Sequence, residues 1–131
     1  GFFTILRIER EHRPGGLQIQ TRSGAWVDVP AVPDSFVINI GDTLMRWSND
    51  RWISTMHRVI NPPRATAAGN SRMSLPFFFK ANQDAVLECL PNCYDTDNPA
   101  KYPPVTAGAY NQESLGRAFS FTRQMKGGSD N

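Results

Sequence analysis

Short apolar runs that alternate with polar residues recur along the first 90 positions of the chain, and turn-forming residues separate them. Period-two alternation of this kind is typical of half-buried β-strands, and the runs are rich in the β-branched and aromatic residues that favour strands. The pattern predicts strands at 2–8, 17–21, 25–29, 36–40, 52–60, 72–79 and 86–90.

Turn signals between these runs predict how some of the strands connect. The charged segment 9–13 and the Pro-Gly-Gly that follows it predict a turn that starts a hairpin after the first strand. Ser23 and Gly24 predict a tight turn that makes 17–21 and 25–29 antiparallel neighbours. We expect Asp42 to be the N-cap of a short helix at 43–47, because its carboxylate can accept N–H groups of the first turn.

The character of the sequence changes after residue 90. A turn-rich stretch leads to an expected helix at about 107–125, and we expect the tail, residues 126–131, to be disordered. Many short strands with few helices predict an all-β core, either an antiparallel sandwich or a double-sheet jelly roll, with a short helix and a C-terminal helix.

Composition narrows the class of protein. The chain has 131 residues, the length of one domain, and it has no run of 18 apolar residues, so we expect a soluble protein without a membrane span. The 14 basic and 12 acidic residues are scattered, which argues against a nucleic-acid partner. Cys89 and Cys93 lack the second Cys/His pair of a structural zinc site. We expect them to be reduced thiols and the protein to be cytoplasmic, since no secretory signature is present.

His57 is a candidate metal ligand. Alternation places it on one strand face with Ile53, Thr55 and Val59. A neutral imidazole on a rigid strand can bind Fe, Zn, Cu or Ni, but a single histidine on an apolar face can equally be a hydrogen-bonded core residue. His12 lies in a charged turn and is expected to be solvated.

Arg72 and Ser74 form a second candidate site. Their i, i+2 spacing directs both side chains to one face of a strand, where a guanidinium and a hydroxyl can together bind a carboxylate. The alternative is an arginine that pairs with an Asp or Glu of this chain. Phe78 shares their face and could line a pocket. The tryptophans and the other two phenylalanines of this strand are expected to pack in the core or against the sheets: Trp26, Trp47, Trp52, Phe77 and Phe79.

Several segments together resemble a known family. GGLQIQTRSGAWVDVP, VINIGDTLMRWSNDRWISTMHRVINPP and RMSLPFFF occur in the order seen in iron(II)/2-oxoglutarate-dependent dioxygenases. The chain is similar to the branch typified by isopenicillin N synthase, plant flavonoid and gibberellin oxygenases and fungal relatives. The resemblance covers residues 1 to about 105.

The resemblance implies a double-stranded β-helix, which is a jelly-roll variant, and an Fe(II) ion held by two histidines and one carboxylate. It identifies His57 as the distal histidine ligand, and Arg72 and Ser74 as the R-x-S motif that binds the far carboxylate of 2-oxoglutarate. The implied activity uses O2 and couples oxidative decarboxylation of 2-oxoglutarate to oxidation, most often hydroxylation, of a small organic substrate. The expected pocket-wall residues are Phe3, Leu6 and Phe78.

The sequence departs from this family at one important place. The family's H-x-D motif lies just ahead of a segment such as GFFTIL, which here places it before Gly1, and His12 is followed by Arg13 and Pro14. We therefore expect an upstream segment of the same protein to supply the missing His and Asp, and the 131-residue chain alone to be inactive. Arg72 follows His57 by 15 positions, more than is usual in this branch, and the extra residues fall in the loop 62–70.

The predicted organisation is a C-terminal part of the jelly roll at 1–105, a helical segment at 106–125 and a tail at 126–131. The alternative function is a non-enzymatic jelly-roll module that binds a carboxylate ligand or a partner through Arg72 and Ser74.

Overall fold

The computed structural model describes residues 1–8, 16–61 and 73–116. The chain divides into two compact units, one formed by Gly1–Met45 and Trp52–Lys80, the other by Arg46–Arg51 and Ala81–Asn131. Arg72, His12 and the tail at 126–131 lie outside the described residues, as does the expected helix beyond 116.

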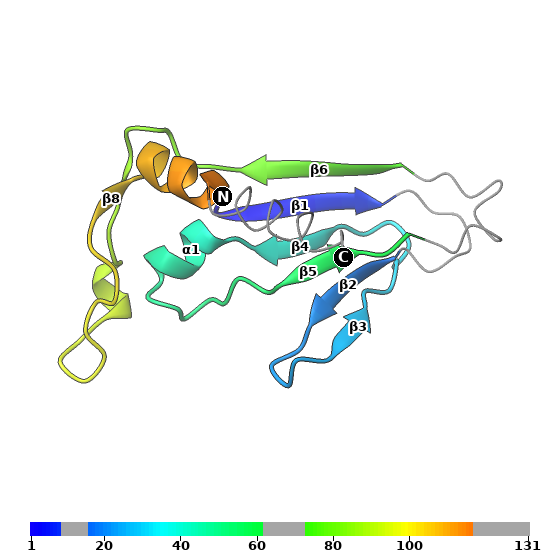
Figure 1. The fold of residues 1–131 in the computed structure, drawn as a ribbon, viewed down its shortest axis with the longest axis horizontal. Coiled ribbons are helices and arrows are strands. Elements are labelled where there is room, and N and C mark those ends of the chain that lie inside the picture. Colours follow the sequence, from blue (N-terminus) through cyan, green and yellow to red (C-terminus); the bar gives the residue numbers. More distant parts are fainter. Residues whose placement is uncertain (9–15, 62–72, 117–131) are drawn as a thin grey trace, which may run out of the picture. The chain divides into compact units, whose positions relative to one another are not determined.

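The first sheet of unit 1 has the strand order β4-β1-β6 (Figure 1). Its strands are β1 (Phe3–Ile8), β4 (Val37–Ile40) and β6 (Ser74–Phe79), and both pairings are antiparallel. Ile5 lies opposite Ile38 on one side and Phe77 on the other, so apolar side chains meet across the sheet. The predicted strands at 2–8, 36–40 and 72–79 are confirmed in their described parts.

The second sheet of unit 1 has the order β3-β2-β5. It comprises β2 (Leu17–Gln20), β3 (Trp26–Asp28) and β5 (His57–Val59). The tight turn between β2 and β3 is confirmed: Gly24 has a φ of 85°, and its N–H donates to the carbonyl of Thr21 at 2.9 Å. The predicted antiparallel pairing of these two strands is confirmed as well.

The prediction of a hairpin between the first strand and the second is wrong. β1 pairs with β4 and β6, while β2 pairs with β3 and β5. Both edges of β1 are occupied by other strands, so neither can accept β2.

The strand expected at 52–60 is much shorter in the structure. Only His57–Val59 forms β5, opposite Leu17–Ile19 of β2. One further main-chain bond flanks the ladder at each end, from Gln20 N–H to Met56 O at 2.8 Å and from Ile60 N–H to Gly16 O at 2.7 Å. Residues 52–56 alternate with the period of a strand, but no described strand pairs with them.

Helix α1 spans Asp42–Trp47, so Asp42 lies in its first turn and the expected N-cap role is wrong. The carbonyl of Gly41 accepts the N–H groups of Leu44 and Met45, and the carbonyl of Gly1 accepts the N–H of Thr43 at 3.2 Å. A backbone group distant in sequence thus satisfies a donor that a local carboxylate was expected to bind. The Asp42 carboxylate still lies at the end of the helix that favours negative charge.

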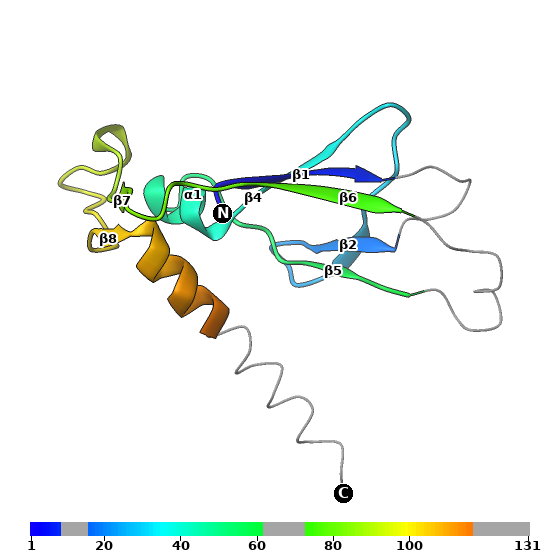
Figure 2. The same ribbon diagram turned by 90° about the horizontal axis from the view of Figure 1, so that it is seen from above.

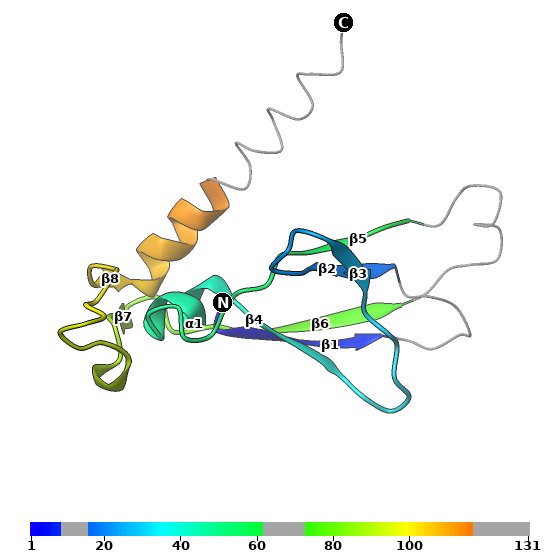
Figure 3. The ribbon, with the colours of Figure 1, turned by 90° about the horizontal axis from the view of Figure 1, so that it is seen from below.

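Figure 3 shows the two sheets of unit 1 as two layers. Each sheet has one buried side chain among its strands, Ile8 in β1 at 8% exposure and Leu17 in β2 at 6%. In a two-layer unit the face that carries the buried residues is the face toward the other layer. The opposite face of the first sheet is apolar and open, with Ile38, Leu75 and Phe77 each more than half exposed.

Some of the expected core residues are therefore exposed in the described chain. Phe77, Phe78 and Phe79 are between 47% and 61% exposed, and Trp52 is also exposed. Trp26 and Trp47 are partly buried. Phe77 and Phe79 lie on the face of the first sheet that no further layer of the described residues covers, and Phe78, on the other face, is 58% exposed as well.

Unit 2 contains β7 (Val86–Leu87), the short 3-10 helix η1 (Pro91–Cys93), β8 (Val105–Thr106) and a helix at 107–116 (Figure 2). The strand expected at 86–90 is shorter than predicted, and β8, its antiparallel partner, was not predicted. The helix begins at 107 as expected. Both cysteines are free thiols, and no helix among the described residues is long and apolar enough to cross a membrane.

Asn49 and Asp50 organise the irregular part of unit 2. The Asn49 side chain is buried, donates to the carbonyls of Cys93 and Pro99, and accepts the N–H of Lys101 at 2.9 Å. The Asp50 carboxylate accepts the hydroxyl of Tyr102 at 2.8 Å and the ammonium of Lys101 at 2.9 Å. Partial burial opposes the charged form of Asp50, but these hydrogen bonds outweigh it and lower its pKa, while the Asp50 bond raises the pKa of Tyr102.

Gly16 should tolerate alanine poorly. It has a φ of 65°, and an added Cβ would lie 2.3 Å from the carbonyl oxygen of Ile60. We expect Gly16→Ala to lower the free energy of unfolding by more than the roughly 1–2 kcal/mol cost of a left-handed residue. Gly24→Ala is the matched control, since its φ is 85° but its Cβ would meet nothing within 4 Å. Urea unfolding of both variants measures the difference, and equal losses would contradict the steric argument.

Asp50→Asn should destabilise the protein in a pH-dependent way. Because folding lowers the pKa of Asp50, its contribution is present above the unfolded pKa of about 3.9 and is lost as pH falls through the folded pKa. We expect a loss of about 1–3 kcal/mol at neutral pH, from the charge-assisted hydrogen bonds, that vanishes in acid. Denaturation of the wild type and the variant across this range measures it. The exposed Asp84→Asn serves as control, and a pH-independent Asp50→Asn loss would contradict the assignment.

Candidate functional site

His57 opens β5 and lies directly opposite Ile19 of β2. Val59, on the same face of β5, lies opposite the buried Leu17. Side chains at paired positions share a face of the sheet, so the imidazole lies on the apolar face of β3-β2-β5, as the alternation predicted. The general rule for two-layer units directs this face at the other sheet, but the imidazole itself is exposed among the described residues, as is Val59 at 62%.

The imidazole of His57 is held in one orientation by the main chain. Its Nδ1 lies 3.1 Å from the carbonyl oxygen of Thr55. A carbonyl can only accept a hydrogen bond, so in the neutral imidazole this contact corresponds to the tautomer with the proton on Nδ1 and the lone pair on Nε2. A histidine that binds a metal through one ring nitrogen typically donates the other N–H to a carbonyl or carboxylate in this way.

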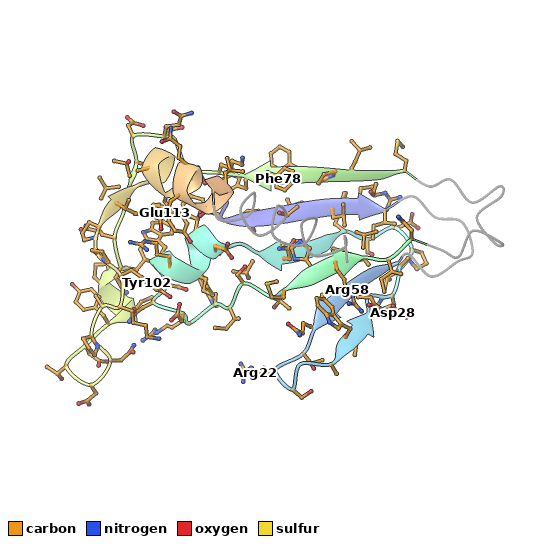
Figure 4. All side chains as sticks on the ribbon, in the orientation of Figure 1. Arg22, Asp28, Arg58, Phe78, Tyr102 and Glu113 are labelled. Atoms are coloured by element: carbon orange, nitrogen blue, oxygen red, sulfur yellow. The ribbon has the colours of Figure 1, made fainter. Side chains whose placement is uncertain are left out.

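Ser74 begins β6 and lies opposite Ile8, the buried residue of β1. Leu6 lies opposite Pro76, and Phe78 lies opposite Thr4, so alternation puts these side chains on the face of Ser74. The register therefore places Ser74, Leu6 and Phe78 on the face that carries the buried side chain. Figure 4 shows Phe78 on β6.

Phe3 lies on the opposite face of this sheet. It pairs with Ile40 and Phe79, and its ring stacks on that of Phe79 with centroids 4.8 Å apart. The structure thus does not bring Phe3 together with Leu6 and Phe78, which lie on the other face of the sheet. The expected pocket-wall roles of all three stay predictions.

The candidate residues come from two sheets of unit 1. His57 lies on β3-β2-β5 and Ser74 on β4-β1-β6, each on the face with the buried residue. Arg72, two positions before Ser74, is outside the described residues. Among the residues that the structure describes, no three His, Cys, Asp or Glu side chains are grouped to hold a metal ion. His57 has the geometry of one ligand, and the described chain offers no second or third beside it.

A cluster of side chains on the outer face of β3-β2-β5 was missed by the sequence reasoning. The Arg58 guanidinium lies over the Trp26 ring, 4.1 Å from its centroid, and its Nε donates to Gln18 Oε1 at 2.9 Å. Gln18 in turn donates to Asp28 at 2.8 Å. Each member occupies a position of its strand where alternation points outward, but only the pairing of the three strands brings them together.

A model of the 2OG-Fe(II) oxygenase superfamily matches residues 1–81. A 2-oxoglutarate-Fe(II) type oxidoreductase of Emericella nidulans is 45% identical over 129 residues, which cover 94% of this chain. The chain belongs to the 2OG-Fe(II) oxygenase superfamily.

Solved structures of this superfamily are similar to the chain in fold and in sequence. A full-length Neurospora crassa protein in complex with alpha-KG has a TM-score of 0.74 and 31% identity over 88% of this chain and 35% of its own. JOX2 in complex with 2OG, Fe and JA has a TM-score of 0.72 and 33% identity over 86% of this chain and 31% of its own. The chain spans about a third of the length of these relatives, and 35% of the Emericella protein.

The hydrogen bond to Thr55 predicts a single tautomer of His57. Long-range proton–nitrogen-15 spectra of the metal-free protein should show a protonated Nδ1 and an unprotonated Nε2 at neutral pH. The solvent-exposed histidine expected at position 12 should instead show averaged tautomers, and His12→Gln assigns the two sets of signals. A His57 protonated mainly on Nε2 would contradict the described geometry.

Proposed function

We propose that this chain is the C-terminal part of an Fe(II)/2-oxoglutarate-dependent oxidoreductase that acts on a small organic substrate. The observation that carries the proposal is the orientation of His57: its Nδ1 contacts the carbonyl oxygen of Thr55, and its Nε2 has no hydrogen bond to any residue that the structure describes. Family membership through residues 1–81 supports it. We propose that His57 is one of three iron ligands.

Arg72 and Ser74 are proposed to hold the far carboxylate of 2-oxoglutarate. The guanidinium would form two parallel charge-assisted hydrogen bonds, and the Ser74 hydroxyl would donate a third to the same anion. The placement of Ser74 opposite Ile8 supports this role, because that face carries the buried side chain of β1. Leu6 and Phe78 would cover the site with apolar surface and exclude water.

The whole protein is proposed to form a double-stranded β-helix, completed by an upstream segment that supplies the other histidine and the aspartate. The open apolar face of β4-β1-β6 supports a longer protein, since Ile38, Leu75 and Phe77 are each more than half exposed. Contiguous exposed apolar surface of this kind marks a face that another segment covers. The share of each relative that the chain spans, about a third, is in keeping with this.

When bound, Fe(II) and 2-oxoglutarate supply the oxidising chemistry: O2 is consumed, 2-oxoglutarate is converted to succinate and CO2, and the substrate is oxidised, most often by hydroxylation. The residues of this chain orient the reactants. His57 presents one neutral nitrogen at a fixed angle, Arg72 and Ser74 fix the direction of the co-substrate, and the apolar side chains limit water.

The proposal predicts that substitutions at the metal ligand weaken Fe(II) binding, whereas substitutions at the R-x-S motif weaken 2-oxoglutarate binding. In the full-length protein, His57→Ala should weaken Fe(II) binding at least 100-fold, because a ligand is lost. Ser74→Ala should weaken 2-oxoglutarate binding about tenfold, the effect of one charge-assisted hydrogen bond, with Fe(II) binding unchanged. Arg72→Gln should weaken 2-oxoglutarate binding by more than Ser74→Ala does. Anaerobic titration, followed through the weak visible charge-transfer band of the chelate, measures both constants.

The matched control is Ser23→Ala, which removes a hydroxyl from the β2–β3 turn and should change neither constant. We also expect the 131-residue chain alone to form no succinate, whereas the full-length protein does so with iron present. Binding of 2-oxoglutarate that depends on Arg72 and Ser74 but not on a metal would favour the non-enzymatic, carboxylate-binding module. Full metal binding by His57→Ala would overturn the ligand assignment.

A further inference from the structure

We propose that Arg58 is a positioning residue that sets the orientation of His57 from the opposite face of β5. This inference rests on the proposed role of His57 as a metal ligand. Its basis is the Arg58, Gln18, Trp26 and Asp28 cluster, which ties β5 to both other strands of its sheet.

The strand that carries His57 has few restraints of its own. β5 is three residues long and lies at the edge of the sheet, with β2 as its neighbour. Its ladder pairs Leu17–Ile19 with His57–Val59, and single main-chain bonds continue it on either side. A short edge strand held along one side can twist about that side, and such a twist would move the His57 ring and the Thr55 carbonyl relative to each other.

Arg58 opposes that twist. Adjacent residues of a strand point to opposite faces, so the Arg58 side chain leaves β5 on the face opposite to the His57 imidazole. There its guanidinium stacks over Trp26 of β3 while Nε donates to Gln18 of β2, and Gln18 continues the chain of bonds to Asp28 of β3. Figure 4 labels Arg58 on β5 and Asp28 on β3, the two strands on either side of β2 in this sheet.

The contact uses properties that only arginine combines. Stacking on an indole requires a planar or cationic group, and the bond to Gln18 requires a donor part-way along the side chain. Because Arg58 lies on the other face from the proposed metal, its charge is not directed at the ion. Its effect on the site would pass through the backbone of residues 57 and 58.

Arg58→Met tests this in the full-length protein, because methionine keeps an unbranched stem but loses the guanidinium. Two quantities are measured: the Fe(II) dissociation constant under anaerobic conditions, and the tautomer of His57 in the metal-free protein from long-range proton–nitrogen-15 spectra. We expect about tenfold weaker Fe(II) binding, the lower end of the range for groups that orient a metal ligand, together with loss of the single Nδ1-protonated tautomer. Arg58→Lys should recover part of the affinity, since it keeps the cation over Trp26.

The matched control is Arg22→Met. Arg22 is an exposed arginine at the far end of the β2–β3 hairpin (Figure 4), and its replacement should leave both quantities unchanged. A merely structural role of Arg58 would lower the melting temperature of Arg58→Met but leave the Fe(II) constant and the tautomer of the folded protein as in the wild type, and this result would overturn the inference.

The two proposals fail in different ways. If His57→Ala binds Fe(II) as tightly as the wild type, the ligand assignment fails and the inference falls with it. If His57→Ala loses the metal while Arg58→Met retains wild-type affinity and a single His57 tautomer, the proposed function stands and only the positioning role is overturned.

Discussion

The antiparallel register between β2 and β5 is the constraint on which the candidate site depends. It places His57 opposite Ile19 and Arg58 opposite Gln18, so one pairing directs the imidazole to the apolar face and the guanidinium to the polar one. Because side chains alternate with a period of two, a shift by one residue would exchange the two faces and bring Arg58 inward. The hydrophobic face of the strand therefore fixes the position of the candidate ligand.

Register also decides which side chains share a face in the first sheet. β1 pairs along both edges, and its register with β6 decides that Ser74 lies opposite the buried Ile8 while Phe3 lies opposite Phe79. Apolar residues occupy both faces of this sheet. One face carries the candidate site, and the other is left open in the described chain, where Ile38 and Phe77 are more than 60% exposed.

Distant backbone contacts complete the local elements. The N–H of Thr43 is bound by the carbonyl of Gly1, and the Asn49 side chain is bound by the carbonyls of Cys93 and Pro99, 44 and 50 positions away. Neither partner can be inferred from local sequence. A carboxylate at position 42 is a good N-cap by residue type, yet the structure uses it in the first turn of α1 because another acceptor is present at the cap.

The mainly β character, most of the strands, the tight turn at Gly24 and, through the motifs, membership of the 2OG-Fe(II) oxygenase superfamily could be predicted from the sequence alone. These depend on periodicity, turn chemistry and residue order, which are local properties. Strand pairing, the three-residue length of β5, the separation of Phe3 from Leu6 and the contact between Arg58 and Trp26 became known only from the folded chain. Strand pairing is non-local: alternation shows which side chains share a face of a strand, but the partner and the register depend on the packing of the whole sheet.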